Sequence, residues 1–475
     1  MLFNSVGFIL FYVIVTSLYF AFPHKFRWII LLLASCYFYM AFVPIYILIL
    51  GFTIIIDYLA GIYIEKAKDK RRRKLLLAAS LVANIGILAF FKYFNFLNLN
   101  IDRFMGKFNY HDPIPYLTIL LPIGLSFHTF QAMSYTIEVY RGNQKAERHL
   151  GIYSLYVMFY PQLVAGPIER PQNILPQMHT EHRFDYELMK SGLKMMLWGF
   201  FKKIVVADRL SIFVNSVFNN PELHNGTTIV IASIFFSVQI YCDFSGYTDI
   251  AIGCARTMGF DLMKNFERPY FATNIQDFWR RWHISLSTWF RDYLYIPLGG
   301  NRVSKQRQYL NLFIVFLISG IWHGANYTYI IWGILHGLYS VVYMIIKPYL
   351  RKEQQSKATA TAIRIGNMAL TCLFVTFAWI FFRANSVSDA LTLIYNLRSF
   401  GAKPFFGDGI SNFAHSILAI FLLFAVEYKM EYYPEKFNFF TSPNIALRWG
   451  SVAFTIILIL LLGVFNGGQF IYFQF

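Results

Sequence analysis

Two histidines lie where a titratable side chain is unusual. His323 ends an uncharged, apolar run that begins at Tyr309, and His336 lies in the next apolar run beside Gly337. At about 1.5 Å per residue, a helix through the first run carries His323 roughly 20 Å from its start. Imidazole exchanges protons near neutral pH, and a titratable group at membrane depth marks a functional site by default. The alternative interpretation is a hydrogen bond between two packed helices.

A third histidine, His283, lies in a segment rich in tryptophan and arginine. Arg280 and Arg281 precede it, and Arg291 follows it. Arginine forks match phosphate oxygens, so this segment suits a phosphate-bearing donor such as coenzyme A or a carrier phosphopantetheine. Alternatively, the arginines and tryptophans anchor an interfacial helix. A buried histidine at one end and a basic mouth at the other would form an acyl-transfer channel.

Other polar groups are less specific. Asp243 and Asp249 lie six residues apart in an apolar helix, where they could relay protons in a transporter, pair with arginines or cap helices. No acidic residue accompanies the three histidines at ligand spacing, so we expect no metal. The four cysteines lack metal-binding spacing and are expected to be packing thiols.

The composition describes a membrane protein. Of 475 residues, 57% are hydrophobic and 14% charged, with a mean hydropathy of +0.46, which excludes an ordinary soluble enzyme and a disordered chain. No alternating barrel pattern occurs, so the fold class is predicted to be all-α, a polytopic bundle of ten to twelve spans. The candidate spans are 3–21, 28–43, 45–63, 75–97, 115–138, 188–206, 227–254, 309–323, 326–346, 365–382, 412–427 and 448–465.

The basic residues predict the orientation. The net charge of +17 lies mainly between apolar runs, which indicates positive-inside topology and contact with anionic lipids rather than nucleic acid. The run 66–74 holds seven lysines and arginines and is predicted to face the cytoplasm. Counting spans from it places Lys25 and Arg27 inside and both termini outside.

Three segments fit neither a span nor a polar loop. Residues 149–178 are apolar but interrupted by prolines and glycine, and residues 266–300 mix aromatic and charged side chains. Such segments are tolerated at membrane depth only where protein covers them or water reaches them, so we interpret both as re-entrant or interfacial elements on the cytoplasmic side. Residues 384–404 are predicted to form an amphipathic helix outside.

Taken together, these segments resemble the membrane-bound O-acyltransferase family, and within it the bacterial alginate O-acetyltransferase branch. The resemblance spans nearly the whole chain and is densest from 159 to 337. The motifs that carry it are Phe159–Ile168, Asp243–Tyr247, Asn274–Arg302, Trp322–Gly324, His336–Gly337, Phe381–Ala384 and Phe470–Phe475.

The resemblance implies one family domain over 1–475, with N-terminal helices (1–148), a catalytic core (149–346) and C-terminal helices (347–475). These helices would surround a channel between a cytoplasmic and an outer funnel. His323 matches the family's near-invariant histidine and is assigned as general base, while His283 matches a second polar position and would orient a ligand or polarise a carbonyl. The further channel-lining candidates are His336, Asp243, Ser245, Trp322 and Asn326.

The resemblance also implies a reaction and partners. An acetyl group would come from a cytoplasmic thioester, acetyl-CoA or an acyl carrier, with no bound cofactor. A periplasmic O-acetyltransferase would then acetylate an exported polysaccharide, which places the chain in the inner membrane. The alternatives are a peptidoglycan O-acetyltransferase or a teichoic-acid D-alanyltransferase of the same family. In a different class, the alternative is a proton-coupled secondary transporter that uses Asp243, Asp249 and the buried histidines as a proton path.

Overall fold

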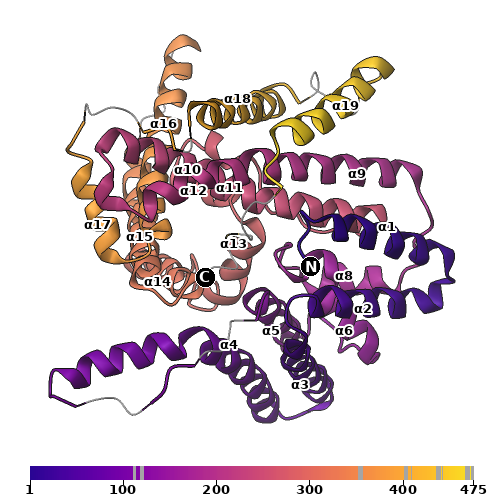
Figure 1. Ribbon diagram of the computed structural model, residues 1–475. Coiled ribbons are helices and arrows are strands. Elements are labelled where there is room, and N and C mark those ends of the chain that lie inside the picture. The colour runs from indigo at the N-terminus through magenta and orange to yellow at the C-terminus, as the bar shows by residue number, and fades with distance from the viewer. Residues whose placement is uncertain are drawn as a thin grey trace. The chain divides into compact units, whose positions relative to one another are not determined.

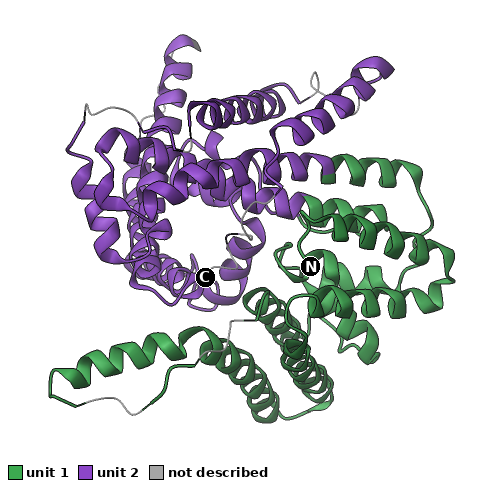
Figure 2. Cartoon of the chain, in the orientation of Figure 1, with its two compact units in different colours: residues 1–196, 250–263 green, residues 197–249, 264–475 purple. Residues whose placement is uncertain are grey.

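The computed structural model describes residues 1–110, 114–117, 122–350, 357–400, 405–407, 409–434, 440, 442–465 and 471. All regular structure in these residues is helical, which confirms the all-α prediction (Figure 1). The helices group into two compact units, 1–196 with 250–263 and 197–249 with 264–475 (Figure 2). Two of the three boundaries fall within helices α9 (Tyr186–Phe200) and α11 (Gly226–Thr257), and the third follows α11, after residue 263. The predicted division into N-terminal, catalytic and C-terminal parts stays a prediction.

The first unit contains long apolar helices followed by short ones. Its elements are α1 (Val6–Ala21), α2 (His24–Met40), η1 (Pro44–Tyr46), α3 (Ile47–Lys66), α4 (Lys70–Gly106), α5 (Leu125–Arg141), α6 (Leu150–Met158), α7 (Tyr160–Leu163) and α8 (Pro171–His179). Asp69 starts α4 as its N-cap and accepts from the backbone N–H groups of Arg71 and Arg72. The predicted broken segment 149–178 is indeed three short helices, and α7 and α8 each have a proline in their first two positions.

The second unit holds the remaining helices. They are η2 (Phe201–Ala207), α10 (Asp208–Phe218), η3 (Pro221–Leu223), most of α11, η4 (Pro269–Phe271), α12 (Ile275–Arg281), α13 (Ile284–Phe290), η5 (Arg291–Tyr295), α14 (Lys305–His323), α15 (Tyr327–Ile346), η6 (Lys347–Tyr349), α16 (Lys357–Arg383), α17 (Val387–Asn396), α18 (Ile410–Tyr432) and α19 (Ile445–Leu462). Segment 266–300 therefore forms short helices, as its broken pattern predicts. The predicted surface helix 384–404 corresponds to α17, and its residues 401–404 lie outside the described residues.

Each predicted span overlaps a helix, although residues 118–121 of span 115–138 lie outside the described residues. Within the described chain, seven helices are long and apolar enough to cross a membrane, and α1 is a shorter apolar helix. The seven are Pro44–Lys66, Lys70–Gly106, Gly226–Thr257, Tyr327–Tyr349, Ala358–Arg383, Ile410–Tyr432 and Ile445–Leu462. The remaining predicted spans are shorter or more polar helices.

Helices α14 and α15 pack against each other through glycine. A Cβ on Gly320 would lie 2.4 Å from the carbonyl oxygen of Tyr329, and one on Gly333 would lie 2.5 Å from that of Phe316. The Cα of each glycine is also 3.1 Å from the Cβ position of the other. Small residues allow membrane helices to approach this closely without a hydrophobic driving force. The contact fixes His323 at the end of α14 relative to α15.

We expect Gly333→Ala to destabilise this pair, because the added methyl group meets backbone atoms that cannot rotate away. The thermal unfolding midpoint in detergent should fall by several degrees. Gly366→Ala in α16 is the matched control, since a Cβ there meets nothing within 4 Å and alanine favours helix over glycine. Equal midpoints for the two variants would contradict the close packing.

Candidate active site

His323 lies at the C-terminal end of α14 and is 5% exposed. Its ring contacts three aromatic side chains edge-on, with centroid distances of 4.9 Å to Trp322, 4.9 Å to Trp332 and 5.3 Å to Phe382. The helix ends here because Gly324 is extended and Asn326 caps α15, accepting from the N–H of Thr328. His323 is therefore buried, as the apolar run before it predicts, and its catalytic role stays a prediction.

The ring of His336 shares a neighbour with that of His323. Trp332 lies 4.9 Å from each histidine by ring centroid. Trp279 of α12 contacts His336 from another side, also at 4.9 Å. His336 is fully buried, and neither of its ring nitrogens has a hydrogen-bond partner among the described residues. Unsatisfied polar atoms at such depth are costly, which favours a polar ligand or water beside them.

A continuous series of aromatic rings links this pair to His283. From Trp332 the contacts run to Trp379 (5.7 Å, stacked), then to Trp282 (5.1 Å) and Phe266 (5.2 Å). Phe266 stacks on His283 at 6.4 Å. We call Trp332, Trp379, Trp282 and Phe266 the aromatic series. The structure thus brings His283, His323 and His336 into one buried aromatic core of the second unit.

Asn265 contacts both the ring of His283 and the backbone of the next residue, Ile284. Its carbonyl oxygen accepts from the N–H of Ile284 (2.9 Å), and its side-chain Oδ1 lies 3.1 Å from Nδ1 of His283. His283 has φ +44°, a left-handed conformation that a non-glycine residue adopts only when its surroundings impose it. Ser285 donates to the same Oδ1 through its backbone N–H and its hydroxyl, at 3.1 and 2.9 Å.

These contacts assign the proton on His283. A backbone N–H can only donate, so the Asn265 atom that receives it is the amide oxygen. His283 Nδ1 faces that same acceptor and therefore carries the hydrogen, which leaves the ring's lone pair on Nε2. Burial lowers the pKa of His283 to about 3, so the ring is neutral at physiological pH. Neutral imidazole with its lone pair on Nε2 can accept a proton or a hydrogen bond.

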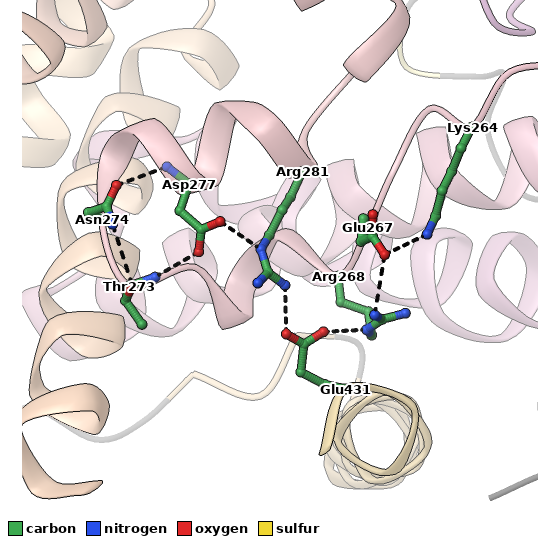
Figure 3. Close-up of polar contacts among 8 residues, drawn as sticks. All are labelled: Lys264, Glu267, Arg268, Thr273, Asn274, Asp277, Arg281 and Glu431. Atoms are coloured by element: carbon green, nitrogen blue, oxygen red, sulfur yellow. Dashed lines mark hydrogen bonds and ion pairs between the residues drawn. The ribbon is translucent and has the colours of Figure 1, made fainter. Parts of the chain in front are cut away.

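The arginines predicted to bind phosphate have different surroundings. Arg281 donates to Asp277 (3.0 Å) and to Glu431 of α18 (2.8 Å), and Arg268 donates to the other oxygen of Glu431 at 2.6 Å (Figure 3). Arg281 thus ties α12 to α18. Arg280 is exposed, and the exposed Arg291 pairs with its neighbour Asp292 at 2.7 Å. Their role in binding a donor stays a prediction.

The intramembrane carboxylates pair with lysines. Lys203 Nζ lies 2.6 Å from Asp243 and 2.7 Å from Asp208, and Lys202 Nζ lies 2.5 Å from Asp249. Both lysines belong to η2, a π-helical segment whose wider turn is common at functional sites. Of the roles left open from the sequence, the structure therefore shows ion pairing, with lysine rather than arginine.

Ser245 and Asn326 occupy distinct places. The Ser245 hydroxyl is fully buried in α11 and has no hydrogen-bond partner among the described residues. Asn326, besides capping α15, donates to the carbonyl oxygen of Asn385 at 2.9 Å. Its contacts are those of a residue that joins α15 to the start of α17.

Sequence reasoning missed several residues of this site. Asn265, Lys203 and Glu427 are buried, and Glu427 accepts from the Tyr241 hydroxyl at 2.5 Å. The available signal for Lys203 was a pair of lysines inside an apolar run. Asn265 lies 18 residues before His283, and nothing in that spacing indicates the contact.

The comparisons with known proteins identify the family of this chain. The model of the membrane-bound O-acyltransferase family matches residues 76–384, and the chain belongs to that family. It is thus an acyltransferase and a membrane protein. It is 37% identical over 84% of its length to the "Probable alginate O-acetylase AlgI" of Pseudomonas aeruginosa, covering 75% of that protein.

Two further relatives carry different names. The chain is 36% identical over 77% of its length to the peptidoglycan O-acetyltransferase of Helicobacter pylori, covering 72% of it. It is 28% identical over 55% of its length to the teichoic acid D-alanyltransferase of Bacillus subtilis, covering 68% of it. The family prediction made from the motifs is confirmed. The final motif, 470–475, lies outside the described residues apart from Ile471.

Lys203→Met should destabilise the protein strongly, because it leaves Asp208 and Asp243 buried without their shared cation. We expect the free energy of unfolding to fall by about 3–5 kcal/mol, measured by denaturation in detergent. Lys190→Met is the matched control. It removes the partner of the exposed Glu187 and should cost at most about 1 kcal/mol. Similar losses would show that the buried pairs contribute no more than a surface pair.

Asn265→Leu removes an acceptor that serves three donors and should lower the free energy of unfolding by about 2–4 kcal/mol. Asn265→Asp keeps the oxygen and should retain most of the stability. If the aspartate variant is as unstable as the leucine variant, the hydrogen bonds are not what stabilises this position.

The Asn265→Asp variant should also differ from the wild type in how its stability depends on pH. The wild type should lose stability as the pH falls from about 6.5 toward 3, because the unfolded chain binds a proton that buried His283 does not. In Asn265→Asp the added carboxylate favours the imidazolium, so the pKa of His283 should rise and the loss should be smaller. Thermal unfolding midpoints across this pH range measure the difference.

Proposed function

We propose that the chain transfers an acetyl group from a cytoplasmic thioester, acetyl-CoA, across the inner membrane for O-acetylation of an exported polysaccharide such as alginate. The observation that carries the proposal is the burial of His323 at the end of α14 among aromatic rings. The names of the most similar relatives support acetyl transfer to a polysaccharide.

In this proposal His323 acts as general base. Its neutral imidazole takes the proton from an acceptor hydroxyl as the oxygen attacks the thioester carbonyl. The new O–C bond forms, the C–S bond breaks, and the leaving thiolate takes up the proton that His323 received. A general base of this kind contributes about 10²–10⁴ in rate. The surrounding indole and phenyl rings limit access of water, which would otherwise hydrolyse the thioester.

His283 has a positioning or polarising role in the same proposal. Its Nδ1 is tied to Asn265, so the ring is held in one orientation with Nε2 as the group that can meet a ligand. A neutral imidazole that accepts a hydrogen bond would orient a hydroxyl or amide N–H of donor or acceptor. Arg280 and Arg291 are exposed and are proposed to meet the phosphates of the donor.

The polar groups of α11 support transfer chemistry over proton transport. Asp243 and Asp249, the carboxylates that a transporter would use, are each in contact with a buried lysine. The peptidoglycan acceptor remains the nearest alternative, because that relative matches with nearly the same identity as the alginate enzymes. A separate periplasmic O-acetyltransferase is proposed to complete the transfer in either case.

His323→Ala should reduce acetyl transfer at least 100-fold with unchanged protein abundance, because it removes the base. Inside-out vesicles would be given acetyl-radiolabelled coenzyme A, with the periplasmic partner and polysaccharide in the lumen, and lumenal label would be counted. His415→Ala, on the partly exposed surface of α18, is the control and should keep wild-type labelling.

The outcomes separate the parts of the proposal. Full labelling by the His323→Ala variant would remove this residue from the mechanism. If the wild type is labelled only from an acylated carrier protein, the donor is not acetyl-CoA. Flux of label without covalent transfer would support a transporter instead.

A further inference from the structure

The first unit contains a small cavity that the proposed reaction does not use. Its volume is about 160 Å³. It lies among the end of α1, the start of α2, the start of α6 and the end of α8. Its apolar wall consists of Tyr19, Trp28, Leu31, Ile152, Leu155, Met178 and Phe260.

The polar part of the cavity is basic. Five of its lining residues can carry a positive charge, and none of the described residues that line it is acidic. The five are His24, Lys25, Arg27, His149 and His179. A cavity with this lining selects an anion, and its volume suits a group the size of a phosphate ester.

Three of the basic groups are held in place. Arg27 donates through Nε to the carbonyl oxygen of Phe22 (3.0 Å) and through Nη1 to that of His182, and its guanidinium stacks over Tyr19. The backbone N–H of Ile152 donates to His149 Nδ1 at 3.1 Å. Because Nδ1 of His149 accepts this hydrogen bond, the N–H of the ring is at Nε2 and can donate there.

His179 is oriented from the other side, since Glu147 contacts its Nε2 at 2.7 Å. Lys25 is exposed at the rim, beside the ring of Phe26. The cavity thus combines basic groups held by hydrogen bonds with an exposed lysine at its rim.

Exposed apolar side chains surround the same region. Phe22 and Phe26 at the turn between α1 and α2, and Phe184 and Tyr186 before and at the start of α9, are all more than 40% exposed. Further along α1 and α2, Leu18, Ile29 and Leu33 are exposed as well. Aromatic side chains at a helix end above an apolar surface are typical of the headgroup level of a membrane.

We propose that this cavity binds the phosphate headgroup of an anionic phospholipid, with the acyl chains along the exposed surface of α1 and α2. The distribution of basic residues predicts that Lys25 and Arg27 face the cytoplasm, the side on which anionic lipids are concentrated. The basic lining requires an anion, and the exposed apolar rim favours a lipid over a soluble phosphate.

Lipid binding can be measured on the full chain purified in a neutral detergent. Native mass spectrometry would follow phosphatidylglycerol, with phosphatidylcholine as the zwitterionic comparison. We expect one phosphatidylglycerol per chain to bind at least tenfold more tightly than phosphatidylcholine. The double variant His24→Gln/Lys25→Gln should lose this preference, with its unfolding midpoint in lipid-free detergent unchanged.

The matched control is Lys66→Gln/Lys68→Gln, which removes two exposed basic side chains outside the cavity and should keep the preference. Equal loss in both double variants, or no loss in the cavity variant, would overturn the proposal. Glycerol phosphate and inorganic phosphate form the soluble arm. If either displaces phosphatidylglycerol at comparable concentration, the cavity is a site for a soluble phosphate and the lipid assignment is wrong.

Discussion

The buried charge of Lys203 is the constraint on which much of the second unit depends. A lysine that is 1% exposed is tolerated only with carboxylates around it, and here they come from two different helices. Asp208 begins α10 and Asp243 lies in α11, and the backbone N–H of Ile471 also donates to Asp243 at 2.7 Å. One ammonium group therefore joins η2, α10 and α11, and through Asp243 a residue close to the C-terminus.

The pairing of Lys203 with Asp243 depends on a close approach of α11 to η2. Gly246 of α11 faces η2, and a Cβ there would lie 2.8 Å from the carbonyl oxygen of Gly199 and 3.0 Å from the backbone N of Lys203. The absence of a side chain lets α11 approach closely enough for Asp243 to reach the lysine. The π-helical turn of η2 shifts the register so that Lys202 and Lys203 both meet carboxylates of α11.

Much of the fold could be predicted from the sequence, because the length of an apolar run and a histidine within it can both be recognised from neighbouring residues. The all-α class, the broken segments 149–178 and 266–300, and His323 at the end of its helix are all present. The partners of the charged groups could not be predicted. The residues around Arg281 in the sequence predict that it binds phosphate. In the structure it donates a hydrogen bond to Glu431, 150 residues away. Such pairings depend on tertiary packing, which the pattern of apolar residues along the sequence does not reveal.

The hydrogen bond between Asn265 and His283 has a consequence for the direction of proton movement. A ring whose Nδ1–H is held by an amide oxygen cannot pass a proton from one nitrogen to the other without breaking that bond. Any proton that Nε2 accepts must leave from the same atom. The imidazole can therefore take up and release a proton at Nε2 alone, so its two nitrogens do not form a path for protons.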